Sequence, residues 1–419
     1  MGFTINGVDV MSKYDTTYAN ESITTISGFK INGTDIGKSA TPAVAGYTTD
    51  DPDTNDAFKT SNVSFNQLFS TSKPLVQLQG LASGGWIQAY NVGDYYFYDD
   101  IYWNNWRNLL RFTIPNVPGI QIPLRILIIG GGGGGGSGGG IGDGVGGGGA
   151  GTFLELTMTL NESHNQAYFR SHIGIGGGGG GSYSSYKGHH GAMGRDTYLQ
   201  LRNASGEAIN QYIAEGGAGG GGNGGHIYYT GDNGNPNNGR RGSGGGSCGA
   251  YGDNRAGGTA GDPTYLVDIY RPSEHPTTTV DAARAHDGGP GRQGNNRPGG
   301  GGGGAGANGG AGIYHINVGG TGGSGYTWIN GNRYAGGGGG GNGNSGGGAP
   351  GNGDRAAGAG VNALNDRHAI HGTGSGGLGM YHDHYQSPHG GNGATGRVSI
   401  AVPRIFIDAN YHTFTPLYN

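Results

Sequence analysis

Few groups in this sequence have the residue types and spacing that chemistry requires. The histidines of His382-Asp383-His384 stand two residues apart. Because alternate side chains of an extended chain point the same way, His382 and His384 could share one metal ion, and a trimer would supply six such nitrogens. Exposed loop histidines are the simpler interpretation. We therefore expect no bound metal and no other cofactor.

The carboxylates give little support to catalysis. Glycoside hydrolysis needs a pair of them, and the candidates are Asp50-Asp51-Asp53 and Asp99-Asp100, both of which have the surroundings of solvated turns. Matches to the nucleotide-binding pattern G-x-G-x-x-G occur throughout, but none lies in a strand–helix unit. The single cysteine, Cys248, is expected to be a small buried residue. The sequence therefore predicts a protein that is not an enzyme.

Glycine sets the organisation of the chain. There are 102 glycines in 419 residues, against a usual share of about 7%. They form runs such as residues 130–136, 146–149 and 176–181, and several runs directly follow strand-like apolar words. A disordered linker would be poor in aromatic residues, but these make up 10% of the chain. Collagen would need glycine strictly at every third position.

The remaining interpretation is a packed bundle of polyglycine-II helices. These extended helices have three residues per turn and no internal hydrogen bonds. Because glycine has no side chain and keeps its N–H, neighbouring helices can bond backbone to backbone. Strand candidates at 124–129, 152–160, 167–175, 196–202, 208–214, 312–318, 326–330 and 396–402 accompany the runs. The predicted fold class is all-β with packed polyglycine-II helices.

Five segments follow from changes in composition. Two near-repeats, GFTINGVDV and GFKINGTDI, each centre on Asn-Gly, the strongest short hairpin signal. We expect an N-terminal attachment arm at 1–40, a linker at 41–62, a small aromatic-rich β domain at 63–123, the glycine-rich domain at 124–402 and a closing tail at 403–419. In the small domain, the aromatic residues Trp86, Trp103, Trp106 and the run at 95–98 are expected to form much of the core, with a sugar-binding platform as the alternative.

The loops between glycine runs are rich in Tyr, His, Asn and Arg, residues typical of binding loops held by a rigid scaffold. We expect contacts from loops 182–195, 226–241, 326–334 and 380–389, and a loop at 262–287. The candidate binding residues are Tyr183, Tyr186, His189, His190, Tyr228, Tyr229, Arg240, Tyr326, Trp328, Tyr334, Tyr381, His382, His384 and Tyr385.

The order of these motifs resembles a known family. Residues 127–129 lead into the run 130–136, which is followed by 146–151, strand 152–160 and the words at 172–176. This arrangement resembles the glycine-rich domain of bacteriophage tail-fibre proteins and the distal adhesins of T-even phages. The resemblance covers residues 124–402. It implies stacked polyglycine helices that present variable loops to a host receptor, without catalysis.

The predicted function is therefore a phage tail-fibre or tail-tip adhesin, located in the virion. Its expected partners are a bacterial outer-membrane protein or glycan, and other tail proteins through the N-terminal arm, with a homotrimer favoured. A net charge of −4 with scattered basic residues gives no nucleic-acid footprint. No secretory signal pattern begins the sequence. Two alternatives stay open: a non-adhesive structural fibre of the virion, and a surface-glycan hydrolase.

Overall fold

The computed structural model describes two compact units, Met1–Leu75 with Pro115–Ile120, and Val76–Ile114 with Gln121–Asn419. The described residues are 4–5, 8–9, 30–31, 34–35, 76–81, 87–101, 105–116, 118–138, 144–180, 189–224, 227–228, 242–248, 267–292, 297–313, 315, 317–342, 353–355, 359, 367–380 and 389–413. This part of the chain contains no helix with the length and hydropathy that a bilayer span requires.

The first unit contains two short hairpins. Strands β1 (Thr4–Ile5) and β2 (Val8–Asp9) are antiparallel across Asn6-Gly7, and β3 (Lys30–Ile31) and β4 (Thr34–Asp35) across Asn32-Gly33. Two-residue Asn-Gly connections match the twist of paired strands. Paired strands therefore lie where the near-repeats predict hairpins.

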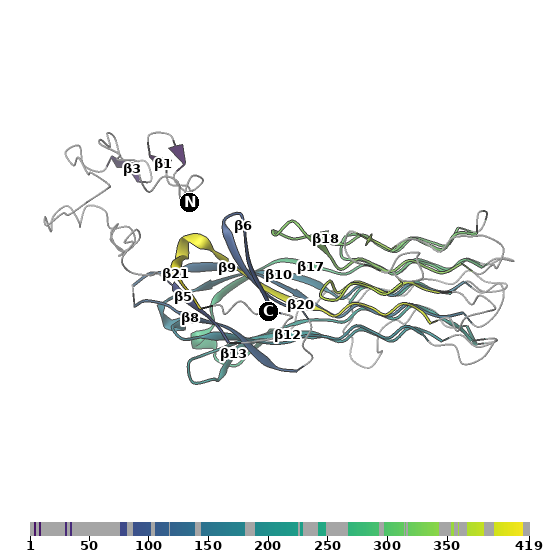
Figure 1. Ribbon diagram of the computed structural model, residues 1–419, viewed down its shortest axis with the longest axis horizontal. Helices are drawn as coiled ribbons and strands as arrows, with labels where there is room; N and C mark the ends of the chain where they lie inside the picture. The colour runs from purple at the N-terminus through teal and green to yellow at the C-terminus, as the bar shows by residue number, and fades with distance from the viewer. Residues whose placement is uncertain are drawn as a thin grey trace, which may run out of the picture. The chain divides into compact units, whose positions relative to one another are not determined.

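The second unit contains two large sheets (Figure 1). The six-stranded sheet has the order β17-β10-β9-β20-β7-β6. Its strands are β17 (Thr277–Arg284), β10 (Phe153–Leu160), β9 (Ile122–Ile129), β20 (Arg397–Pro403), β7 (Tyr95–Asp100) and β6 (Ile87–Val92). All its neighbouring strands are antiparallel.

The seven-stranded sheet has the order β16-β13-β12-β11-β8-β5-β21. Its strands are β16 (Val267–Ile269), β13 (Ala208–Ala214), β12 (Thr197–Arg202), β11 (Tyr168–His172), β8 (Arg107–Thr113), β5 (Val76–Gly80) and β21 (Ile407–Thr413). Only β21 and β5 run parallel. Three-residue 3-10 turns, η2 (Glu162–His164), η3 (Pro272–Glu274) and η6 (Arg404–Phe406), each connect a strand of one sheet to a strand of the other.

The core lies between the two sheets. Strands β12 and β13 contact β9, and β12 also contacts β20. Apolar side chains on the inner faces, among them Phe112, Phe169 and Leu199, are fully buried. The hydroxyl of Ser171 on β11 donates to Asp100 on β7 across the interface, at 2.7 Å. Because β7, β8 and β5 belong to these same sheets, the domain boundary predicted between residues 123 and 124 falls inside one sandwich.

Glycine segments continue the strands of the sandwich beyond its edge. Strand β9 runs directly into residues 130–138, and residues 144–152 lead back into β10. Strands β11, β13 and β17 run into glycine segments in the same way, and β12 and β20 follow them. Neighbouring strands lie about 4.8 Å apart. The sandwich therefore delivers these segments side by side, close enough for backbone contact (Figure 1).

The hydrogen bonds of residues 130–138 repeat every three residues. The N–H groups of Gly130, Gly133 and Gly136 donate to residues 152, 149 and 146 of one neighbouring segment. The N–H groups of residues 131, 134 and 137 donate to a second segment, at residues 195, 192 and 189. The N–H groups of residues 132 and 135 donate to a third segment, at residues 394 and 391. Successive residues thus face three different neighbours in turn.

The carbonyl groups of the same segment follow the same period. Gly217 and Gly220 donate to the carbonyls of Gly131 and Gly134, at 2.8 Å each. In a second neighbouring segment, the N–H groups of residues 177 and 180 donate to the carbonyls of residues 132 and 135. In a third, those of residues 377 and 380 donate to the carbonyls of residues 133 and 136. Three neighbours therefore accept from this segment and three donate to it. Segment 144–152 is surrounded in the same manner, by residues of 215–221, 300–303, 374–377, 133–136, 243–246 and 338–341.

Close packing explains why the segments are glycine. A Cβ added at Gly148 would lie 2.6 Å from the carbonyl carbon of Gly133 and 2.9 Å from that of Gly134, closer than real side chains approach. At the edge of the bundle, glycine is required only at every third position. In residues 189–195, Gly191 and Gly194 are buried, whereas His189, Ala192 and Arg195 are exposed. Side chains are therefore accommodated where the segment faces solvent.

Two predicted elements differ from the structure. Residues 312–318 form an isolated bridge between Ile313 and Val318 rather than a strand. The predicted loop 262–287 contains β16, η3 and β17 in its described part. Strand β17 has a solvent-facing edge position and a mixed sequence, TTTVDAAR, without strict apolar alternation.

Candidate functional site

Two predicted binding loops, in segments 182–195 and 380–389, begin and end at one place, the end of the glycine bundle away from the sandwich. Their flanking residues are hydrogen-bonded to one another. The N–H of Ser137 donates to the carbonyl of His189 at 2.8 Å, and that of Gly390 to Gly180 at 2.9 Å. The N–H of Gly138 donates to Met380 at 3.1 Å. We call this region, where residues 137–138, 180, 189, 380 and 390 are hydrogen-bonded, the loop end.

Most of the predicted contact residues lie outside the described residues. Those are Tyr183, Tyr186, Tyr229, Arg240, Tyr381, His382, His384 and Tyr385; for Tyr228 only the backbone of strand β15 (Ile227–Tyr228), which pairs with β14 (Asn223–Gly224), is described. Their roles stay predictions. What the structure gives is the position of the chain on either side of them.

Two predicted residues, His189 and His190, are described and exposed at the loop end. The backbone of His189 is fixed, because its N–H donates to the hydroxyl of Ser137 at 3.0 Å and its carbonyl accepts from the Ser137 backbone. The scaffold therefore holds the backbone within this contact segment, and both residues are exposed.

Tyr326, Trp328 and Tyr334 lie elsewhere, in a hairpin against the six-stranded sheet. Strands β18 (Tyr326–Thr327) and β19 (Arg333–Tyr334) form this hairpin. The side chains of Trp328 and Tyr334 are only 3% exposed, packed with Phe97, Leu127 and Ile129, and Tyr326 packs on the same cluster. We therefore correct the sequence-based assignment of Trp328 and Tyr334: they belong to the core, because the hairpin covers the outer face of the sheet. Tyr326 is half-buried beside them, and its binding role stays a prediction.

A buried polar network fastens that hairpin to the sheet. Arg397 on β20 donates to the carboxylate of Asp99 at 2.8 Å and to the hydroxyl of Tyr334 at 3.0 Å. Tyr90 donates to Asp99, and Asn330 donates to both tyrosine hydroxyls. Burial alone would lower the pKa of the Arg397 guanidinium, but the neighbouring Asp99 carboxylate raises it overall. The network therefore keeps a charged pair inside the protein.

The same observation corrects the prediction for Asp99-Asp100. Both side chains are fully buried rather than solvated. Asp99 faces the hairpin network, whereas Asp100 faces the interior, where it accepts from Ser171 and lies 3.8 Å from Arg107. Adjacent residues of a strand point to opposite faces. The two carboxylates therefore cannot flank one glycosidic bond, and a polysaccharide could not reach either.

Among the described residues, no group of three or more His, Cys, Asp or Glu side chains is arranged to hold a metal ion. The metal candidates His382 and His384 lie outside these residues. Cys248 is buried, as predicted.

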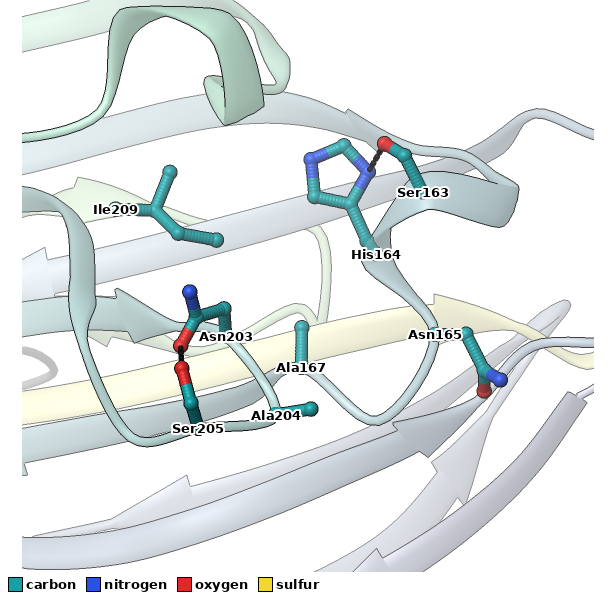
Figure 2. A pocket seen from close by; sticks show the side chains of 8 residues that line it. All are labelled: Ser163, His164, Asn165, Ala167, Asn203, Ala204, Ser205 and Ile209. Atoms are coloured by element: carbon teal, nitrogen blue, oxygen red, sulfur yellow. Dashed lines mark hydrogen bonds between the residues drawn. The ribbon is translucent and has the colours of Figure 1, made fainter.

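A small cavity of about 240 Å³ lies beside η2 and the β12–β13 turn (Figure 2), at the end of the sandwich away from the glycine segments. His164 and Asn203 are among its lining residues. Both imidazole nitrogens of His164 are engaged, Nδ1 with Asn161 and Nε2 with the carbonyl of Glu274 at 3.0 Å. Burial lowers the pKa of this imidazole. Because neither nitrogen is free, the cavity lacks an available acid or base.

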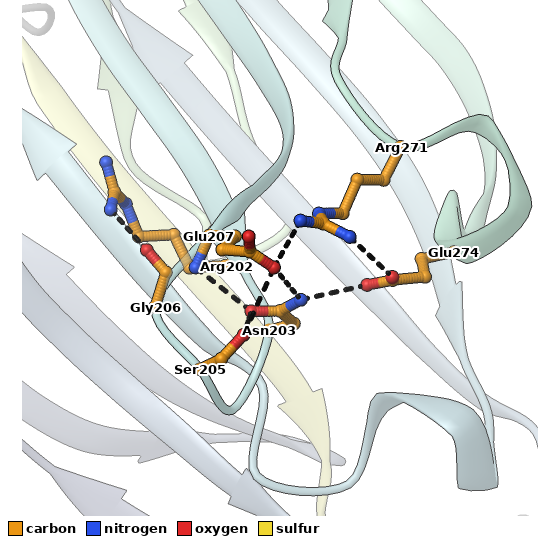
Figure 3. A network of polar contacts seen from close by, with 7 residues as sticks. All are labelled: Arg202, Asn203, Ser205, Gly206, Glu207, Arg271 and Glu274. Atoms are coloured by element: carbon orange, nitrogen blue, oxygen red, sulfur yellow. Dashed lines mark hydrogen bonds and ion pairs between the residues drawn. The ribbon is translucent and has the colours of Figure 1, made fainter.

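An ionic network closes the surface next to this cavity (Figure 3). Arg271 pairs with Glu207 and, at 3.4 Å, with Glu274, and the amide of Asn203 donates to both carboxylates. The hydrogen bond from Asn203 lowers the pKa of Glu207, and the charge of Arg271 lowers it further against the opposing effect of desolvation. Exposed pairs of this kind contribute little stability each. The network fixes the β12–β13 turn against η3.

No protein-family model and no curated protein matches this chain.

Proposed function

We propose that the glycine segments are polyglycine-II helices packed in a hexagonal array. The three-residue period of their hydrogen bonds supports this assignment, since polyglycine II has three residues per turn. Three neighbours that accept and three that donate are the expected surroundings of a helix inside such an array. The described glycines of the runs 130–138 and 144–152 also avoid positive φ, in agreement with a φ near −75°.

Cooperation between many segments makes this array stable. Ordering one glycine costs about 1–2 kcal/mol, and one hydrogen bond contributes only about 0.5–1.5 kcal/mol net. An isolated segment would therefore remain disordered. An inner segment such as 130–138 bonds through both its N–H and its carbonyl groups, and the strands that deliver it have already fixed one end.

We infer that the protein is a receptor-binding adhesin of a bacteriophage tail fibre or tail tip. The observation that carries this inference is the loop end, where a hydrogen-bonded backbone array holds the flanks of two Tyr- and His-rich segments, 182–195 and 380–389. Rigid presentation lowers the ordering cost of binding. The Asn-Gly hairpins of the first unit would serve as the attachment arm, in a homotrimer within the virion. The receptor would be an outer-membrane protein or glycan of the host bacterium.

Loop replacement tests the proposal. Residues 381–388 would be replaced by a Gly/Ser segment of equal length, and binding of the labelled protein would be measured on a panel of bacterial strains. His190→Ala is a milder change at the same end. Arg333→Ala, an exposed position in the β18–β19 hairpin, is the matched control. The adhesin account predicts that the two loop-end changes weaken cell binding and that the control does not.

A structural fibre gives the opposite result. If all three folded variants bind cells as the parent does, or if the parent binds no strain in the panel and immunogold labelling finds the chain on the head or collar, the adhesin account fails and the structural alternative replaces it.

A further inference from the structure

The outer face of the seven-stranded sheet has an unusual set of side chains. On β11, Phe169 and Ser171 face the core, so Tyr168, Arg170 and His172 face outward. On β12, Leu199 and Leu201 face the core, and Tyr198, Gln200 and Arg202 face outward. The hairpin that covers the six-stranded sheet has no described counterpart on this face.

Aromatic side chains form one row across this face. His172 and Tyr198 are directly opposite each other on neighbouring strands. The indole of Trp106 lies 5.7 Å from the ring of His172 and 6.0 Å from that of Tyr198, measured between ring centres. All three side chains are half-buried. They form a rigid, partly exposed platform with polar ring atoms at its edges.

Arginines line the next two rows. Arg170 lies over the Trp106 ring at 5.2 Å and is opposite Gln200. Tyr168 is opposite Arg111 on one side and Arg202 on the other, and the Arg111 guanidinium lies 5.5 Å from its ring. We call Trp106, Arg111, Tyr168, Arg170, His172, Tyr198, Gln200 and Arg202 the arginine face.

These guanidinium groups have no carboxylate partner in the described part of the chain. Arg202 donates only to Gln200 and to the carbonyl of Gly206. Arg170 makes no hydrogen bond to described residues, and Arg111 Nε is buried without one. By contrast, buried Arg397 on the other sheet is paired with Asp99. Three unpaired cations on a chain of net charge −4 therefore mark a local excess of positive charge.

The electrostatics of Arg170 agree with this geometry. Partial burial and the nearby charge of Arg202 both lower the pKa of its guanidinium. An anion placed between the two arginines would relieve their repulsion. Guanidinium groups bind carboxylates through two parallel hydrogen bonds.

We propose that the arginine face is a binding site for an acidic polysaccharide built of uronic acids. The apolar C–H face of a sugar ring would pack on Trp106 and Tyr198, its carboxylate would accept hydrogen bonds from Arg170 and Arg202, and Gln200 would bond its hydroxyls. A row of rings beside a row of cations matches a polymer that repeats both features. The site lies on the sandwich and is separate from the loop end, so it goes beyond the adhesin proposal.

Calorimetric titration of the full chain with polygalacturonate tests the site, with neutral dextran as the matched polymer. We expect polygalacturonate to bind, dextran to bind much more weakly, and raised salt to weaken binding. Loss of a charge-assisted hydrogen bond predicts a Kd about tenfold or more higher for Arg170→Ala. Arg170→Lys, which keeps the charge but loses the planar fork, should recover only part of the affinity.

Two further variants separate stacking from charge. Trp106→Ala should also weaken binding about tenfold, while Arg195→Ala, which removes an exposed arginine from a glycine segment, should leave the Kd unchanged. Circular dichroism and the free energy of unfolding identify the variants that remain folded. Absence of polygalacturonate binding overturns the proposal. So does equal weakening by Arg195→Ala, an unchanged Kd for folded Trp106→Ala and Arg170→Ala, or tighter binding of a single-stranded oligonucleotide.

Discussion

Adjacent glycines 177 and 178 offer a direct test of the packed array, because only one of them faces inward. Gly177 is buried and Gly178 is exposed. A Cβ on Gly177 would lie 2.7 Å from the carbonyl carbon of Ala192 and 2.8 Å from the nitrogen of Gly134. A Cβ on Gly178 would have nothing within 4 Å. The two atoms that crowd a Cβ on Gly177 belong to the backbone, so rotation of a side chain cannot relieve that clash.

The magnitude follows from the bonds that the clash displaces. Gly177→Ala pushes segment 189–195 away from its neighbours and strains two hydrogen bonds, Ala192 N–H to Gly178 at 2.8 Å and Gly134 N–H to Ala192 at 2.9 Å. Each contributes about 0.5–1.5 kcal/mol net, and up to about 3 kcal/mol if a buried partner stays unsatisfied. We expect Gly177→Ala to lower the free energy of unfolding by about 2–5 kcal/mol.

Gly178→Ala is the control, since it makes the same chemical change one residue away. Its effect should lie between zero and a gain of about 1 kcal/mol, because alanine restricts the unfolded chain more than glycine does. Denaturant unfolding of both variants, followed by circular dichroism, measures the difference. Equal stability of the two variants would refute the close backbone packing on which the fold depends.

Three other changes probe the sandwich and its hairpin. Asp99→Asn should lower the free energy of unfolding by about 3–5 kcal/mol, because it leaves the buried Arg397 uncompensated, whereas Arg333→Ala should cost less than about 1 kcal/mol; denaturant titration compares them. Trp328→Ala should cost about 3–5 kcal/mol yet leave cell binding of the folded variant intact, and a loss of binding would return Trp328 to the contact surface. Since burial lowers the pKa of His164 below its ordinary 6.5, the unfolded chain binds protons more readily, and stability should fall as pH drops through 6.5; a folded His164→Gln variant with the same pH dependence would contradict this.

Local signals predicted much of the fold. Paired strands lie at both Asn-Gly words, and strands β9, β10, β12, β13 and β20 lie close to their predicted positions. The alternating words that predict these strands are rich in apolar residues because one or both faces are buried. Strand β17 lacks that pattern, because at its edge position three of its eight residues are exposed and none is fully buried.

The errors at the site come from burial, which composition does not encode. Trp328 and Tyr334 occur between glycine runs, as binding-loop residues do, yet they cover the six-stranded sheet. The sequence around Asp99-Asp100 resembles a solvated turn, because the partner of Asp99, Arg397 on β20, lies almost three hundred residues later in the chain. The arginine face could not be predicted from the sequence either, because the pairing of β8, β11 and β12 brings together residues from separate parts of the chain. The one related prediction was the alternative of a sugar platform among the aromatic residues of the segment 63–123, which contains Trp106.

Hydrogen–deuterium exchange of the peptide that covers residues 130–153 tests the central claim most directly. In the packed array, the amides of 131–136 and 146–151 are bonded to neighbouring segments and are expected to exchange orders of magnitude more slowly than a free glycine peptide, with protection close to that of strand β10. Exchange of these amides at the free-peptide rate, while β10 stays protected, would contradict the account.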